Sequence, residues 1–464
     1  MPLNKNLLLD RQESFNIVNR VIVWLEILKF SNTAKYLFEV FHDMKLIDAH
    51  EHLPPEKIRT GRKVDALTLF SNYVRWDLAS AGMPQESINS LQDTDIPVKQ
   101  RWKRFAPYLE RVRHGSFARA SFIAAKEFYG YDDINETNCV ALSEKMMTEN
   151  TPGIYDRILR KKCKIEAALT QSSYWGRWWS DNRLDFDDGI LVPLAEPHLG
   201  GFGEIRTKKD VNELAEKLGE TVKTLDDYLA LTKRGLEKWK LAGAVGLKMS
   251  SLPYDASDRT QAESLFDKLM HNPNEHLPEM NPLRSYLMEF ILDQAAELEV
   301  VVAIHAGIWV PPTYSSHDPR HMIPIIIRHP QTRFDLYHLG FPYVNETIMI
   351  AKNFPNVWLN LCWCHILSPS MTCSAMSKLI DAIPVNKVIA FGGDYGIGPM
   401  GPVGGKKMGP PVEKVYGHLL IARENIAKVF AARIDSGILT LDQAISIAEK
   451  WFYQNPKDLY NLKV

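Results

Sequence analysis

Two histidines separated by a single residue, His50 and His52, are the first side chains in this sequence whose spacing could do chemistry. They end a short apolar segment, residues 46–52. Because side chains of a β-strand alternate between its faces, both imidazoles would point one way and Glu51 the other. Two neutral imidazoles on one face can bind one divalent metal ion. The pair is therefore a candidate half of a metal site.

Four further ionisable residues lie at or near the ends of later apolar segments. They are Lys248, His305, His338 and Asp394. A lone histidine at a strand end is usually structural, and an aspartate after two glycines usually caps a turn or a helix. Together with the histidine pair, however, they give five groups in sequence order at the ends of separate strands. This order favours a shared site.

Eight short apolar or β-branched segments could supply the strands that position these residues. They are residues 46–52, 163–170, 189–196, 244–249, 299–305, 333–338, 357–362 and 387–394. Helical patterns lie between them, for example at residues 208–218, 225–241, 282–298, 345–352 and 414–434. The spacing suits βα units of a parallel sheet. It predicts an α/β fold, a (β/α)₈ TIM barrel, whose catalytic residues gather at the carboxyl ends of the strands.

Two segments depart from the regular βα pattern. Residues 1–45 are predicted to form an N-terminal helical segment, with an amphipathic helix at residues 21–30. About 110 residues separate the first two strands, which is far more than one crossover needs. We therefore expect a helical subdomain inserted at about residues 53–162, over the mouth of a barrel that comprises residues 46–464.

Composition narrows the classes of function. The 464 residues are 45% hydrophobic, carry a net charge of −1, and contain no basic block of the kind that binds nucleic acid. No apolar stretch has the length of a membrane span, and the N-terminus lacks a secretion signal. The five cysteines form no CxxC pair, which fits a reducing compartment. We expect a cytoplasmic enzyme with a small-molecule substrate and without nucleic-acid or membrane partners; whether it forms a homo-oligomer is left open.

The ordered set of His-x-His, lysine, two histidines and aspartate resembles the amidohydrolase superfamily of metal-dependent (β/α)₈-barrel enzymes. The strand ends His-Ala-Gly at residue 305, His-Leu-Gly at residue 338 and Gly-Gly-Asp at residue 394 are similar to those of its amidohydrolase-related branch. The run Tyr73-Val74-Arg75-Trp76 and the long insertion also resemble uronate isomerase, a divergent member of the same superfamily.

This resemblance implies a set of metal ligands and their roles. The implied ligands are His50, His52, His305 and Asp394. Their nitrogen and oxygen donors suit Zn²⁺ first, with Mn²⁺ or Fe²⁺ as alternatives, and one or two ions. Asp394 would also transfer the proton of the reaction, while His338 would polarise a substrate oxygen or bind a second ion. Lys248 would bridge two ions if carboxylated, or bind substrate as a cation.

Five residues are weaker candidates for substrate contacts, and each has a structural role as its alternative. They are Tyr73, Arg75, Trp175, Arg177 and His365. Within the insertion, Arg75 could hold a substrate carboxylate through two hydrogen bonds. Trp175 and Arg177 belong to an aromatic run after the second strand, which suits a ring or a sugar face. His365 follows the seventh strand and would face the same mouth.

The same site suits three reactions. The leading expectation is a metal-dependent hydrolase, in which metal-bound hydroxide attacks an amide, lactone or ester-like carbonyl of a small carboxylate-bearing substrate. The alternatives are an aldose–ketose isomerase similar to uronate isomerase, favoured by Tyr73, Arg75 and the insertion, and a non-oxidative decarboxylase of an aromatic acid. A non-catalytic barrel with a structural metal is disfavoured, because structural sites usually have four protein ligands, often thiolates.

Overall fold

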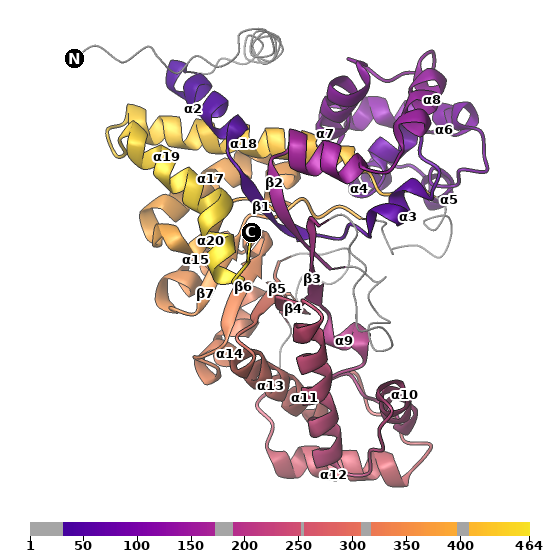
Figure 1. Ribbon diagram of the computed structural model, residues 1–464, viewed down its shortest axis with the longest axis vertical. Coiled ribbons are helices and arrows are strands. Elements are labelled where there is room, and N and C mark those ends of the chain that lie inside the picture. Colours follow the sequence, from indigo (N-terminus) through magenta and orange to yellow (C-terminus); the bar gives the residue numbers. More distant parts are fainter. Residues whose placement is uncertain (1–30, 172–188, 252–254, 308–316, 397–407) are drawn as a thin grey trace.

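Eight parallel strands form the centre of the molecule (Figure 1). The computed structural model describes residues 31–171, 189–251, 255–307, 317–396 and 408–464. The strands are β1 (Leu46–Glu51), β2 (Ile165–Thr170), β3 (Leu191–Ala195), β4 (Gly246–Ser250), β5 (Val301–His305), β6 (Arg333–Tyr337), β7 (Val357–Asn360) and β8 (Val388–Ile389). Each strand pairs with the next along the chain, in the order β1 to β8. The predicted (β/α)₈ barrel is confirmed.

The barrel closes between β8 and β1 through the segment that follows β8. The Ala49 amide donates to the Phe391 carbonyl at 3.0 Å, and the Asp394 amide donates to the His50 carbonyl at 2.8 Å. β8 itself has two residues, fewer than the predicted 387–394. The reason is that side chains of β1 replace backbone acceptors in this segment, so the regular ladder ends early while the seam stays closed.

The seventh strand also ends earlier than predicted. β7 ends at Asn360, two residues before the predicted end at residue 362. Trp363 has a φ of 64°, in the left-handed region, and the short helix α16 (Cys364–Leu367) follows at once. The chain therefore turns away from the strand direction before His365.

Helices surround the barrel on the outside (Figure 1). They are α9 (Pro197–Gly200), α10 (Lys208–Leu218), α11 (Leu225–Leu241), α12 (Arg259–His271), α13 (Pro282–Glu297), α14 (Met322–Arg328), α15 (Val344–Asn353), α16, α17 (Pro369–Ala382), α18 (Glu413–Asp435), α19 (Leu441–Glu449) and α20 (Asn455–Leu459). Threonine caps define several starts. Thr207 and Thr224 each form a capping box with an aspartate three residues later.

The segment between β1 and β2 is helical. Its α-helices are α3 (Glu56–Thr60), α4 (Val74–Ser80), α5 (Gln85–Ser90), α6 (Val98–Val112), α7 (Ser116–Ala124) and α8 (Cys139–Glu149). α7 and the preceding helix α2 (Asn32–Asp43) both contact α18. Gly417 permits the close approach of α7, because a Cβ there would overlap the Ala120 carbonyl oxygen. The amphipathic helix predicted at residues 21–30 lies outside the described residues.

Inward-facing side chains fill the barrel below its mouth. They include Ile47, Ala49, Leu169, Leu194, Val301, Ala303, Tyr337, Cys362 and Ile389. Asp335, a polar residue of this interior, accepts hydrogen bonds at one carboxylate oxygen from Asn360 at 3.0 Å and from Tyr460 at 2.7 Å. In the described part of the chain, no helix is both long and apolar enough to cross a membrane.

Candidate metal centre

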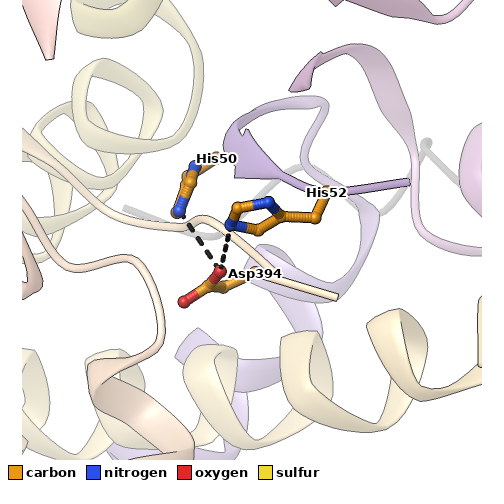
Figure 2. A group of neighbouring side chains, drawn as sticks. All are labelled: His50, His52 and Asp394. Atoms are coloured by element: carbon orange, nitrogen blue, oxygen red, sulfur yellow. Dashed lines mark ion pairs between the residues drawn. The ribbon is translucent and has the colours of Figure 1, made fainter. Parts of the chain in front are cut away.

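Three predicted ligands converge at the junction of β1 and the segment after β8 (Figure 2). His50 Nε2 and His52 Nε2 each lie 3.2 Å from Asp394 Oδ1. The ligand atoms of the three residues all lie within 4.8 Å of one another. Two imidazole nitrogens and one carboxylate oxygen at this spacing fit a single divalent ion. We refer to these three residues as the triad.

The protonation states of His50 and Asp394 match those that metal binding requires. Burial lowers the pKa of His50 to about 3, so this imidazole is neutral. Burial alone would raise the pKa of Asp394, but the attraction and hydrogen bonds of His50 and His52 hold it well below its usual range. The triad therefore offers a neutral His50 and an ionised carboxylate at neutral pH.

Acidic side chains of β1 hold the turn that carries Asp394. Asp48 Oδ1 accepts a hydrogen bond from the Gly393 amide at 3.1 Å, and Glu51 Oε2 accepts one from the Tyr395 amide at 2.7 Å. Asp394 itself has a φ of 60°, in the left-handed region, which is uncommon for residues other than glycine, asparagine and aspartate. Burial raises the pKa of Asp48 to about 7 and that of Glu51 well above its usual value.

Gly393 has no room for a side chain, which gives the first testable prediction. A Cβ at this position would overlap Glu51 Oε1. We expect Gly393→Ala to displace Asp394, to lower the free energy of unfolding by about 1–3 kcal/mol, and to lower the metal content per chain. Elemental analysis after dialysis and urea unfolding measure the two effects.

Gly219→Ala is the matched control for this prediction. Gly219 has a positive φ, unlike Gly393, and an added Cβ there meets nothing. Gly219→Ala should therefore lower the free energy of unfolding through backbone strain alone and keep the wild-type metal content. Wild-type metal content in Gly393→Ala would show that the glycine does not position the triad.

His305 and His338 form a hydrogen-bonded pair beside the triad. His338 Nδ1 lies 3.1 Å from the Cys362 carbonyl, and His338 Nε2 lies 3.1 Å from His305 Nδ1. Because a carbonyl only accepts, we assign the His338 proton to Nδ1, so that Nε2 accepts from His305 Nδ1. Burial lowers the pKa of His338 to about 4 and that of His305 well below its usual value, so both rings are neutral.

This arrangement bears on two of the predicted roles. The structure groups three of the four predicted ligands and places the fourth, His305, next to His338. The assigned tautomer leaves the lone pair of His305 on Nε2, as a metal ligand needs. The proton of His338 is already donated to the Cys362 carbonyl, so this residue is placed to orient His305, and it has no N–H to polarise a substrate oxygen.

Tyr73 reaches the triad from the insertion, one residue before α4. Its ring packs against Trp363 at 5.4 Å and Tyr395 at 6.2 Å, measured between centroids. Burial raises the pKa of Tyr73 well above its usual value, and the charge of Asp394 and a hydrogen bond to it act in the same direction. The site therefore holds a protonated hydroxyl beside an ionised carboxylate.

The other predicted substrate contacts have different outcomes. The Arg75 guanidinium lies 4.6 Å over the Trp76 ring. Trp175 and Arg177 lie outside the described residues. His365 is fully buried, with Nε2 2.9 Å from the Ala390 carbonyl. A substrate contact at His365 does not fit this position, because the turn at residue 363 directs the side chain behind β8 instead of into the mouth.

Lys248 points into the barrel from β4. Its Nζ lies 5.4 Å from the centroid of the Tyr337 ring, and the same ring packs against His50 at 4.5 Å. Burial lowers the pKa of Lys248, whereas the negative charges of Glu196 and Asp394 raise it. The lysine is thus within electrostatic range of the triad.

A buried histidine behind the triad predicts a pH dependence of stability. His418 packs between Phe391, at 4.8 Å, and Tyr395, at 5.9 Å. Burial lowers the pKa of His418 well below its usual value, so the unfolded chain binds a proton here that the folded chain does not. The contribution of His418 to the free energy of unfolding therefore decreases as the pH falls below about 6.5.

We expect His418→Phe to reduce the slope of unfolding free energy against pH, by about 1.4 kcal/mol per pH unit between about pH 6 and pH 4.5. Urea unfolding at several pH values measures this slope. His418→Leu should give the same slope, which separates the lost titration from changes in ring packing. A wild-type slope in both variants would contradict the prediction.

Comparison with known proteins places the chain in a family. The amidohydrolase family model matches residues 230–462, half of the chain. The chain belongs to this family. The matched region of this amidohydrolase-family protein includes Lys248, His305, His338 and Asp394, whereas His50 and His52 precede it. The resemblance to the amidohydrolase superfamily is confirmed.

Its similar proteins include uronate isomerases. One from Caldanaerobacter subterraneus subsp. tengcongensis is 22% identical over 303 residues, which are 61% of this chain and 62% of the relative. The solved uronate isomerase of Thermotoga maritima has a TM-score of 0.74 and 17% identity, over 93% of this chain and 98% of that one. The glucuronate isomerase of Caulobacter crescentus has a TM-score of 0.72 and 16% identity, over 100% and 98%.

These relatives overturn the expectation of a hydrolase. The sequence match covers less than two thirds of the relative's length, and the solved structures show a shared fold. Every one of these relatives is nevertheless named an isomerase. The expectation rested on the strand ends at His305 and His338, which form part of the barrel centre. Because one barrel can host many reactions, those strand ends do not decide the chemistry.

Proposed function

We propose that this protein is a metal-dependent aldose–ketose isomerase that acts on a uronate, a sugar acid. The observation that carries this proposal is the position of Tyr73, which the insertion places against Trp363 and against Tyr395, the neighbour of Asp394. The chain also shares the fold of the Thermotoga maritima uronate isomerase over 93% of its length. An isomerase must move a proton between two carbons. A paired acid and base at the triad suits that task.

The triad would hold one divalent ion. Its donors favour Zn²⁺, with Mn²⁺ or Fe²⁺ as alternatives. A bound ion would supply Lewis-acid polarisation of the substrate carbonyl and its neighbouring hydroxyl. Within the described residues, one group of His, Cys, Asp or Glu side chains could hold an ion, which favours one ion over two. His305 is a proposed additional ligand.

The reaction converts the aldehyde at C1 and the hydroxyl at C2 into a C1 alcohol and a C2 ketone. A base removes the proton from C2 while the carbonyl oxygen at C1 gains a proton, which gives the enediol. C1 then gains a proton from an acid while the C2 hydroxyl loses its own, which gives the C2 ketone. We assign the base to Asp394, whose carboxylate is ionised, and the acid to Tyr73, whose hydroxyl is protonated. His338 holds His305 in its tautomer. Arg75 in the insertion is a candidate for the substrate carboxylate.

The direct test is a conversion assay. Metal-loaded protein is incubated with D-glucuronate and with D-galacturonate, and the ketose products are followed by NMR. In D₂O we expect deuterium at C1 of the ketose, because the proposed acid, Tyr73, carries a hydroxyl proton that exchanges with solvent. Chelation should abolish turnover, and added Zn²⁺ or Mn²⁺ should restore it. Absence of conversion of either uronate by metal-loaded protein would overturn the proposal.

The relatives described above give no support to a decarboxylase.

All five cysteines are free, in keeping with the cytoplasmic location that we propose.

A further inference from the structure

Three adjacent strands end in polar side chains that the triad does not use. Gln171 directly follows β2, Glu196 directly follows β3, and Lys248 lies in β4. Leu169 and Leu194, two residues before Gln171 and Glu196, belong to the inward-facing interior. Because strand side chains alternate, Gln171 and Glu196 also face inward, as Lys248 does over Tyr337.

Each of these polar groups lacks a strong partner among the described residues. Gln171 is 8% exposed, and its buried Oε1 accepts no hydrogen bond there. Lys248 is 4% exposed and has the Tyr337 ring as its contact. The Glu196 side chain is 10% exposed, and its contact is His198 Nε2 at 3.5 Å. Buried polar groups without partners lower stability, so three of them together indicate that a ligand completes their hydrogen bonds.

The position of these groups relates them to the triad. The charges of both Glu196 and Asp394 raise the pKa of Lys248 against the effect of burial. The ring of Tyr337 contacts both Lys248 and His50. The ends of β2–β4 therefore face the same barrel mouth as the triad, which lies next to them at β1 and the segment after β8.

The chemistry of the three side chains selects a class of ligand. An amide oxygen and a carboxylate accept hydrogen bonds, and an ammonium group donates them. A hydroxyl group both donates and accepts, so a chain of hydroxyls can satisfy all three. We propose that Gln171, Glu196 and Lys248 form a subsite for the secondary hydroxyl groups of an open-chain sugar acid, whose reacting end lies at the triad. This inference rests on the proposed function and names the part of the substrate that is recognised.

The subsite is tested by Glu196→Gln, which keeps the size of the side chain and removes its charge. D-Glucuronate and D-galacturonate differ in the configuration of one hydroxyl, at C4. We expect kcat/KM to fall roughly tenfold, mainly through KM, because a hydrogen bond to a charged group is lost. The ratio of kcat/KM between the two uronates should also change, at unaltered metal content.

Glu166→Gln is the matched control. Glu166 lies on β2, pairs with Lys45 at 2.9 Å, and is one third exposed. Glu166→Gln should keep the wild-type kcat/KM for both uronates. Lys248→Met serves as a second variant if Glu196→Gln does not fold, and we expect the same direction of change.

D-Glucarate provides a readout that does not depend on turnover, because it carries the hydroxyl groups and lacks the aldehyde. It should raise the melting temperature of the wild-type protein, and Glu196→Gln should weaken that shift. If no uronate is converted, the proposed function fails, while a glucarate shift that depends on Glu196 still supports the subsite. If uronates are converted and Glu196→Gln keeps the wild-type KM, C4 preference and glucarate shift, the subsite is overturned.

Discussion

Replacement of Asp394 by asparagine is expected to lower the turnover of a uronate by about 10²–10⁴-fold. The variant loses the negative charge that faces His50 and His52, each at 3.2 Å, and loses the proposed base at the same time. The fold should persist, because the backbone amide of residue 394 still donates to the His50 carbonyl. An asparagine also tolerates the φ of 60° found here.

The measurements are the rate of ketose formation, the metal content and the circular dichroism spectrum. Asp381→Asn is the control, since Asp381 pairs with Arg433 on the protein surface, away from the triad. Its rate and metal content should equal those of the wild type. If Asp394→Asn retains wild-type turnover, both the metal site and the base assignment are wrong.

The barrel could be predicted because its signals are local. Each strand is an apolar segment buried on both faces, and α10 and α11 start and end at the predicted residues because threonine caps and apolar spacing define them. The ends of β7 and β8 could not be predicted from such signals. They depend on the left-handed turn at Trp363 and on Asp48 and Glu51, whose side chains replace backbone acceptors across the seam.

Part of the candidate site could also be predicted from the sequence. His50, His52 and Asp394 could be grouped because the carboxyl ends of barrel strands share one face. Asp48 and Glu51, the residues that hold the turn of Asp394, were not predicted. The available signal was the presence of two acidic residues inside an apolar strand. The leading expectation for the reaction, hydrolysis, was wrong, because the strand ends at His305 and His338 belong to the barrel and not to its chemistry. The isomerase alternative, which Tyr73, Arg75 and the insertion favoured, is the one that the relatives support.

The anchor of the insertion is a buried ion pair on which stability should depend. Arg59 in α3 donates to Glu413 Oε1 at 2.6 Å, and both side chains are fully buried. Tyr129 also donates to Glu413, at 2.5 Å, and Arg59 donates to Asn150 at 2.8 Å. Glu413 begins α18, so this network joins three parts of the insertion to the last helices of the barrel.

We expect Glu413→Leu to lower the free energy of unfolding by about 3–5 kcal/mol, because it leaves the Arg59 charge buried without its partner. Urea unfolding measures this loss. Glu220→Gln, at the exposed pair with Arg234, is the control and should cost less than about 1 kcal/mol. The double variant Arg59→Met/Glu413→Leu should recover most of the loss, since no uncompensated charge remains. A Glu413→Leu protein within about 1 kcal/mol of the wild type would show that the pair does not anchor the insertion.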